Sequence, residues 1–192
     1  MNLAAIVRDL EQWEDRYPWL YVDKRGYVTI GVGNLVATED ACVKLPLMAP
    51  HAANGARVSG FGMDASEAQK REAWAKVAAA KPNMRASFYR PLTTLRLSED
   101  AIDALAQGRL EREFLPGLRR LYDGFDDLPH SAQSALTDMI FNLGVAGLAK
   151  FHHLQAAVRL RDWQLAALSC HVSTCRKERN DWRAEMLAKA AG

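Results

Sequence analysis

The sequence predicts a mainly α (α+β) protein with one small antiparallel β-hairpin sheet. Apolar residues recur at helical spacing in several segments, and one short stretch places β-prone residues on both sides of a turn. The composition is that of an ordinary globular protein, with 192 residues, 49% hydrophobic and 25% charged. That length is enough for one sizeable core or for two small lobes.

The first predicted element is an amphipathic helix over residues 3–13 or beyond. Its apolar positions recur three and four residues apart, at Leu3, Ile6, Val7, Leu10, Trp13 and Tyr17. Continued at about 100° per residue, the helix places Glu14 inside the apolar stripe and Glu11 at its margin. A carboxyl on an apolar face is partly desolvated, which raises a pKa and suits a general acid. The alternative is that the helix ends before Glu14, whose side chain then caps the helix or is solvated.

A β-hairpin is predicted next. Residues 21–22 and 27–30 are β-prone, and residues 23–26 between them have Asp first and Gly fourth, as in a type I turn. This hairpin orients Asp23 and Thr29 on neighbouring strands near one end of the sheet. The alternative is an ordinary hairpin in which Asp23 only makes its own turn.

The carboxylates of this segment indicate a chemistry. Two carboxylates on separate backbone elements are the minimum set for hydrolysing a glycosidic bond, because one protonates the leaving oxygen and the other activates water or stabilises the developing cation. The spacing E-x8-D-x2-G-x2-T-I-G-x-G, which begins at Glu14, resembles the active-site segment of the phage-type lysozymes, glycoside hydrolase family 24. The resemblance implies that Glu14 is the general acid and that Asp23 and Thr29 hold the attacking water.

Other residues of the segment partly fit this family. Tyr21 matches the pattern and is expected at the substrate. Gly31 and Gly33 let the backbone pass close to either a substrate or a packed helix, and Gly33 is expected at the substrate. Two residues depart from the family. Asp15 stands where a glycine is common, and Asn34 stands where a histidine is usual.

A long helix is predicted after Pro129 and ends at Gly144. Its apolar residues follow helical spacing, at Ala132, Ala135, Leu136, Met139, Ile140 and Leu143. The motif A-L-x-x-M-x-F-N-x-G-x-x-G-x-x-x-F resembles the central helix of the same lysozyme family, which implies that Asn142 borders the substrate cleft and binds sugar. The alternative is a polar residue at a helix C-terminus.

Two further helices are predicted in the tail, after residues 161–163 and from residue 179. In the lysozyme family a C-terminal arginine reaches the catalytic glutamate. Arg179 is the expected one, with Arg176 and Arg183 as the other candidates. The alternative is an arginine on a solvated helix face.

The middle of the chain gives weaker signals. The predicted elements are an irregular stretch over 36–64, a helix over 63–80 capped by Asp64 or Ser66 with Ala68, Trp74 and Val77 buried, a loop over 81–95, and a helix from Ser98 to about Leu115 before Pro116.

The resemblance implies a single lysozyme-like domain over residues 1–192 with two lobes. The hairpin lobe lies within about 15–65, and the helical lobe is formed by 1–14 and about 95–192. The implied activity is that of a muramidase, which cleaves the β-1,4 bond between N-acetylmuramic acid and N-acetylglucosamine in peptidoglycan, with inversion. Peptidoglycan glycan strands are the expected partner. The alternative is a non-hydrolytic peptidoglycan-binding module on the same fold.

Charge and composition argue against a nucleic-acid-binding protein and against a membrane-spanning one. The net charge is only +2 and the pI is about 8.5, whereas a nucleic-acid binder usually has a denser basic stripe. No apolar run approaches membrane-spanning length, and the N-terminus lacks the apolar core of a signal peptide. We therefore expect synthesis in the cytoplasm and export to the wall by a holin, as for an endolysin, or by a secretion machine, as for an antibacterial effector with an immunity protein.

The chain has three cysteines, an odd number that argues against a disulfide scaffold. Cys170 and Cys175 are expected to be free thiols. Histidines and cysteines in this part of the chain do not have the spacing of a zinc site. We expect neither a metal nor another cofactor.

Overall fold

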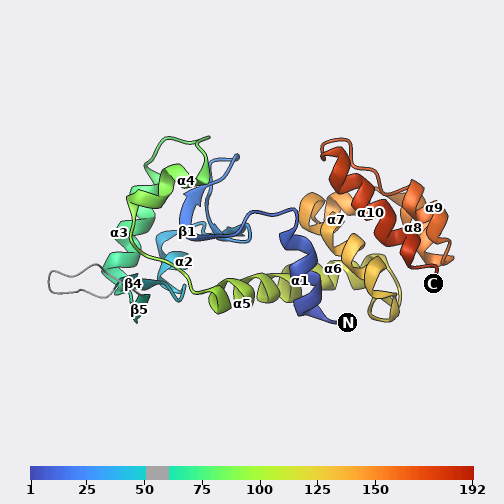
Figure 1. Ribbon diagram of the computed structural model, residues 1–192, viewed down its shortest axis with the longest axis horizontal. Helices are drawn as coiled ribbons and strands as arrows, with labels where there is room; N and C mark the ends of the chain where they lie inside the picture. The colour runs from blue at the N-terminus through green and yellow to red at the C-terminus, as the bar shows by residue number, and fades with distance from the viewer. Residues whose placement is uncertain (51–60) are drawn as a thin grey trace. The chain divides into compact units, whose positions relative to one another are not determined.

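A computed structural model describes residues 1–50 and 61–192 of the chain (Figure 1). It is mainly helical with small antiparallel sheets, so the predicted fold class is confirmed. The chain divides into two compact units. Met1–Trp13 and Gln107–Gly192 form the helical unit, and Glu14–Ala106 form the hairpin unit; each is described by itself. None of the helices in the described residues is long and apolar enough to span a membrane.

The helical unit begins with α1, Leu3–Glu11. The side chain of Asn2 caps it by accepting a hydrogen bond of 3.1 Å from the backbone N–H of Ala5. Its buried residues are Ile6, Val7 and Leu10, which pack toward α7. The amphipathic helix is thus confirmed, but it ends two residues before Trp13, and the predicted extension through Glu14 is wrong.

The rest of the helical unit is also helical. Its elements are the π-helical turn η2 (Leu110–Phe114), α6 (Leu115–Leu121), the 3-10 turn η3 (Phe125–Asp127), α7 (His130–Leu148), α8 (His152–Arg159), α9 (Trp163–Leu168) and α10 (Lys177–Lys189). The predicted helix end at about Leu115 is wrong, because the chain continues as a helix through Pro116. Pro116 is tolerated in the first turn of α6, where its missing N–H has no role in the helix.

Helix α7 matches the prediction closely. Pro129 is its N-cap residue, and Gly144, with φ 70° and ψ 171°, interrupts the helical backbone where the end was predicted. Only glycine adopts this conformation readily. One further helical turn follows to Leu148.

The hairpin unit contains a three-stranded antiparallel sheet of β1 (Tyr17–Val22), β2 (Val28–Gly31) and β3 (Asn34–Leu35), with β2 in the middle. The predicted hairpin is confirmed, with Tyr21 opposite Thr29 and Val22 opposite Val28. Strand β3 was not predicted. The three strands place the segment from Tyr17 to Leu35 in one compact layer.

The other elements of the hairpin unit are α2 (Glu39–Val43), β4 (Met48–Pro50), β5 (Phe61–Asp64), α3 (Glu67–Ala78), α4 (Ala86–Tyr89), η1 (Arg90–Leu92) and α5 (Glu99–Arg109), which ends within the helical unit. The irregular stretch predicted over 36–64 is wrong in its described part, because α2, β4 and β5 lie there; residues 51–60 lie outside the described residues. The loop predicted over 81–95 likewise contains α4 and η1.

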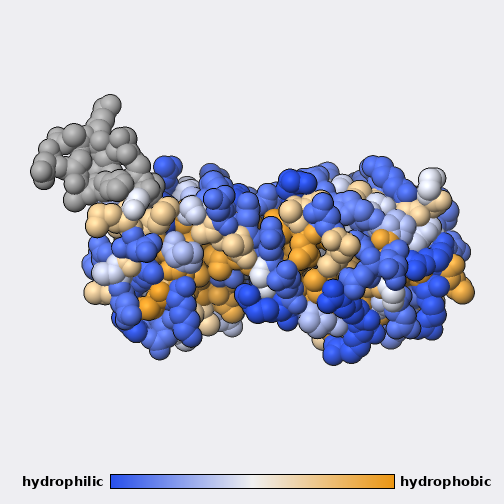
Figure 2. Space-filling model, turned by 90° about the horizontal axis from the view of Figure 1, so that it is seen from below, coloured by the Kyte–Doolittle hydropathy of each residue, from blue (hydrophilic) through white to orange (hydrophobic). Residues whose placement is uncertain are grey.

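The predicted helix caps are confirmed. Ser66 and Gln69 form a capping box at the start of α3, and the Ser98 hydroxyl accepts a hydrogen bond from Ala101 at the start of α5. Val77 is buried as predicted, whereas Ala68 is exposed. Hydrophilic residues cover much of the molecular face shown in Figure 2.

Candidate functional site

The turn between β1 and β2 holds Asp23. The backbone N–H of Gly26 donates to the Asp23 carbonyl at 3.0 Å, which closes the predicted turn, and Gly26 has a φ of 86°. The Asp23 carboxylate oxygen Oδ1 accepts hydrogen bonds from the backbone N–H groups of Arg25 (2.8 Å) and Tyr27 (2.9 Å). Asp23 therefore does make its own turn, as the simpler alternative stated. These two bonds use Oδ1, and none of the described residues bonds Oδ2.

Thr29 lies on β2 next to this turn and is only 3% exposed. Its hydroxyl donates to the Tyr27 carbonyl at 3.1 Å. Thr29 is directly opposite Tyr21 on β1, so the two side chains lie on the same face of the sheet. A hydroxyl that donates its proton to the backbone still has oxygen lone pairs that accept a hydrogen bond.

Glu14 lies after the end of α1 and is half-buried. The argument that placed it on the apolar stripe of a helix is therefore wrong, and the alternative in which the helix ends first is right. The charge of Glu14 nevertheless acts on Tyr21 of the sheet. Burial raises the pKa of Tyr21 most, and the negative charges of Asp15, Asp23 and Glu14 raise it further. The charges of three carboxylates thus act on one half-buried phenol.

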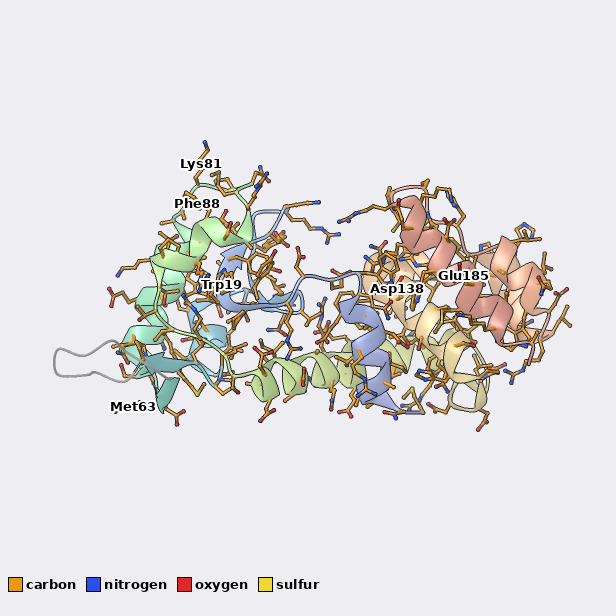
Figure 3. The ribbon with its side chains drawn as sticks, in the orientation of Figure 1. Trp19, Met63, Lys81, Phe88, Asp138 and Glu185 are labelled. Carbon is orange, nitrogen blue, oxygen red and sulfur yellow. The ribbon has the colours of Figure 1, made fainter. Side chains whose placement is uncertain are left out.

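A row of aromatic rings runs along β1 from this cluster. The Tyr17 ring lies 5.1 Å from the Tyr21 ring and 5.3 Å from the Trp19 ring, measured between centroids. The Trp19 indole N–H donates to the Ala86 carbonyl at 2.9 Å, which fixes the indole against α4. Figure 3 shows Trp19 beside β1 in the hairpin unit. We call Tyr17, Trp19 and Tyr21 the aromatic row.

Gly33 lies between β2 and β3 with a φ of 63°, and Gly31 has a φ of 65°. Both values are in the left-handed region, which glycine adopts without strain. A Cβ atom on Gly31 would meet Ile102 of α5 at 3.5 Å, an ordinary van der Waals distance. The positive φ, and not a close approach of the helix, is therefore what favours glycine at this position.

Asn142 and Arg179 lie in the helical unit, where a chain of polar contacts joins them. The Cys175 thiol donates to Asn142 Oδ1 at 3.3 Å, and Arg183 Nη1 lies 3.5 Å from the Cys175 sulfur. Arg183 Nε also bonds Asp138, a fully buried carboxylate of α7. Arg179 bonds the same carboxylate, with Nη2 2.6 Å from Oδ1.

These contacts contradict the alternative of a solvated helix face for two of the three candidate arginines. Arg179 and Arg183 are buried rather than on a solvated helix face, and both are ion-paired with Asp138. Arg176 is exposed at the N-cap of α10. Asn142 is half-buried and hydrogen-bonded to a thiol, a contact that its sequence motif did not indicate.

Sequence reasoning missed Asp138. A signal was present, because Asp138 interrupts the apolar run of the long helix next to Met139 and Ile140, where a charge is buried only with a partner. Two arginines spaced four apart on a later helix, Arg179 and Arg183, could have supplied that partner.

Two further findings concern cofactors and relatives. Among residues 1–50 and 61–192, the side chains of His, Cys, Asp and Glu form no cluster of three that could hold a metal ion. The three cysteines, Cys42, Cys170 and Cys175, are free thiols. No protein-family model matches this chain, and no curated protein matches it.

Proposed function

We propose that this protein is a peptidoglycan hydrolase, a muramidase that cleaves the β-1,4 bond between N-acetylmuramic acid and N-acetylglucosamine and acts at the bacterial wall. The observation that supports this proposal is that the charges of Glu14 and Asp23 both raise the pKa of Tyr21, which lies opposite Thr29 on the same face of the sheet. Two carboxylates from separate elements beside a water-binding hydroxyl meet the needs of glycoside hydrolysis.

In this mechanism a water molecule is held by two acceptors. Asp23 Oδ2 accepts one of its protons, and the Thr29 oxygen accepts the other, because the Thr29 hydroxyl proton is already donated to Tyr27. A water that donates both protons has a lone pair left for attack on the anomeric carbon. Asp23 takes up the proton that the water loses.

Glu14 has the complementary role. Its protonated carboxyl donates to the glycosidic oxygen as the bond to the anomeric carbon breaks, so the leaving sugar departs with a hydroxyl. Attack by water on the opposite face of the ring inverts the anomeric configuration. A product analysed by NMR within seconds of cleavage should therefore first appear as the inverted anomer.

A second candidate is a wall-binding module without hydrolysis. It is favoured by one observation, that Asp23 and Thr29 already have structural bonds, to the turn and to the Tyr27 carbonyl. In such a module these two residues would only stabilise the hairpin, and the aromatic row would bind the sugars.

Dye release from purified, dye-labelled peptidoglycan separates the two candidates. Glu14→Gln keeps the shape and removes the proton donor, so the rate should fall at least about 100-fold. Glu11→Gln, three residues earlier at the end of α1, is the matched control and should retain most of the rate.

Thermal melts of all variants must first show that they fold. If the parent protein binds walls and releases no dye, the binding module is the correct reading. If Glu11→Gln is inactive and Glu14→Gln is not, the general acid is one helical turn earlier than proposed.

A further inference from the structure

The end of the aromatic row bears two positive charges. The guanidinium carbons of Arg90 and Arg96 lie 5.3 Å and 5.5 Å from the centroid of the Trp19 ring. Both distances are in the range of cation–π attraction. Two cations therefore share one indole.

Neither charge is neutralised by an acid. Within residues 1–50 and 61–192, Arg90 and Arg96 take part in no ion pair. Arg96 instead donates to the backbone carbonyls of Arg90, Thr93 and Leu95, at 2.7–2.9 Å. Burial and the neighbouring Arg90 charge both lower the pKa of Arg96. The pair is thus held together against its own repulsion by the fold of this segment.

The surrounding segment adds to the positive potential. Residues 81–98 contain Lys81, Arg85, Arg90 and Arg96, and they contain no Asp or Glu. Arg90 is exposed, whereas Arg96 is half-buried and fixed by its carbonyl contacts. An anion that approaches Trp19 thus meets one preorganised guanidinium and one that is free to adjust.

The aromatic row connects this pair to the candidate catalytic carboxylates. Tyr17 contacts both Trp19 and Tyr21, and the charges of Glu14 and Asp23 act on Tyr21 and raise its pKa. A carbohydrate chain that stacks on these rings would have its cleaved bond near Tyr21 and another part of the substrate at Trp19. An elongated ligand whose sugar rings stack on the aromatic row and which has a carboxylate at one end matches this order of rings and charges.

We propose that Trp19, Arg90 and Arg96 form a subsite for the free carboxylates of the peptide stems that wall glycan strands carry. This inference rests on the proposed function, since it assigns part of the same substrate. The Trp19 face packs against the sugar or the peptide, and the Arg90 guanidinium donates two parallel hydrogen bonds to a stem carboxylate. Arg96 supplies a fixed second charge.

The test uses two soluble probes, the N-acetylglucosaminyl-N-acetylmuramyl tetrapeptide with free carboxylates and the same compound with its carboxylates amidated. Neither contains the bond that a muramidase cuts. Calorimetric titration of the full chain should give binding of the acid about tenfold tighter than of the amide. Arg90→Gln should weaken binding of the acid about tenfold and change binding of the amide less than twofold.

Arg85→Gln is the matched control, because Arg85 is exposed in the same basic segment and is not one of the described arginines that lie over the Trp19 ring. It should change binding of the acid less than twofold. Equal losses in Arg85→Gln and Arg90→Gln would overturn the subsite in favour of diffuse attraction, and so would equal affinities for acid and amide.

The two proposals fail separately. A protein that distinguishes acid from amide through Arg90 but releases no dye from walls has the subsite without the proposed hydrolysis. A protein that lyses walls with no Arg90-dependent preference for the acid is a hydrolase without this subsite.

Discussion

Arg179 and Asp138 form a buried ion pair that joins α10 to α7. Arg179 Nη2 lies 2.6 Å from Asp138 Oδ1, Arg179 is 9% exposed, and Asp138 is fully buried. Arg183 bonds the other oxygen of the same carboxylate, and its buried Nη2 atom has no hydrogen-bond partner among residues 1–50 and 61–192. Asp138 is therefore the shared counter-charge for two buried guanidinium groups.

Asp138→Asn should destabilise the protein by about 3–5 kcal/mol, because it leaves both arginines without that counter-charge. Urea denaturation measures the loss. Glu185→Gln is the control, since Glu185 is exposed on α10, the helix that bears both arginines (Figure 3), and its removal should cost less than about 0.5 kcal/mol. If the two variants unfold alike, the buried pair does not hold these helices together.

Asp23 and Thr29 should behave as one unit in catalysis if they hold a single water. Asp23→Asn and Thr29→Ala should each slow dye release, and the double variant should lose far less than the product of the two effects. Rates of all four proteins on the same wall preparation complete the cycle. Strictly multiplicative losses would contradict the shared water.

Cys42 should make stability depend on pH in the alkaline range. Burial raises the pKa of the Cys42 thiol to about 11, so the folded state holds this proton more tightly than the unfolded state does. The stabilisation is complete below the unfolded pKa and is lost as the pH rises through about 11.

Relative to Cys42→Ser, the native protein should therefore lose about 2–3 kcal/mol between pH 8 and pH 11, measured by urea denaturation at each pH. Serine retains a hydroxyl for the bond that the Cys42 sulfur makes to the Lys70 carbonyl, and it does not titrate in this range. Parallel stability curves for the two proteins would show that Cys42 ionises freely when folded.

Gly26 should tolerate only residues that accept a positive φ. A Cβ atom placed there meets nothing within 4 Å, so the cost of a substitution comes from its φ of 86° alone. Gly26→Ala should lose about 1 kcal/mol, and Gly26→Asn should lose less, because asparagine enters the left-handed region more readily. Equal losses in chemical denaturation would mean that the turn relaxes to another form.

The sequence predicted those elements whose signals are local. Helix α7 between Pro129 and Gly144, the caps at Ser66 and Ser98, and the turn at residues 23–26 are each encoded within a few neighbouring residues. The end of α1 was misjudged because the apolar spacing continues to Trp13 and Tyr17, although the helix does not. Trp13 instead packs its ring on Trp182, with centroids 5.8 Å apart, a contact that no local pattern reveals.

The candidate site likewise contains residues whose positions the sequence predicts and residues whose positions it does not. The positions of Asp23, Thr29 and Tyr21 follow from the register of one hairpin, which the turn residues predict. The pair of Arg90 and Arg96 on Trp19 and the contact of Cys175 with Asn142 join segments distant in sequence. Such contacts are fixed by tertiary packing, so a single sequence gives no spacing from which to infer them.

The division of the chain has a consequence for the order in which it folds. Helix α1 belongs with the residues from Gln107 onward, and the Ser134 hydroxyl donates to Asp9 of α1 at 2.6 Å. The β1–β2 hairpin closes a short loop, whereas α1 must wait for a partner synthesised long after it. Helix α1 is therefore buried later than the hairpin that follows it in the sequence, and pulse-labelled hydrogen exchange during refolding should find the amides of β1 and β2 protected before those of α1.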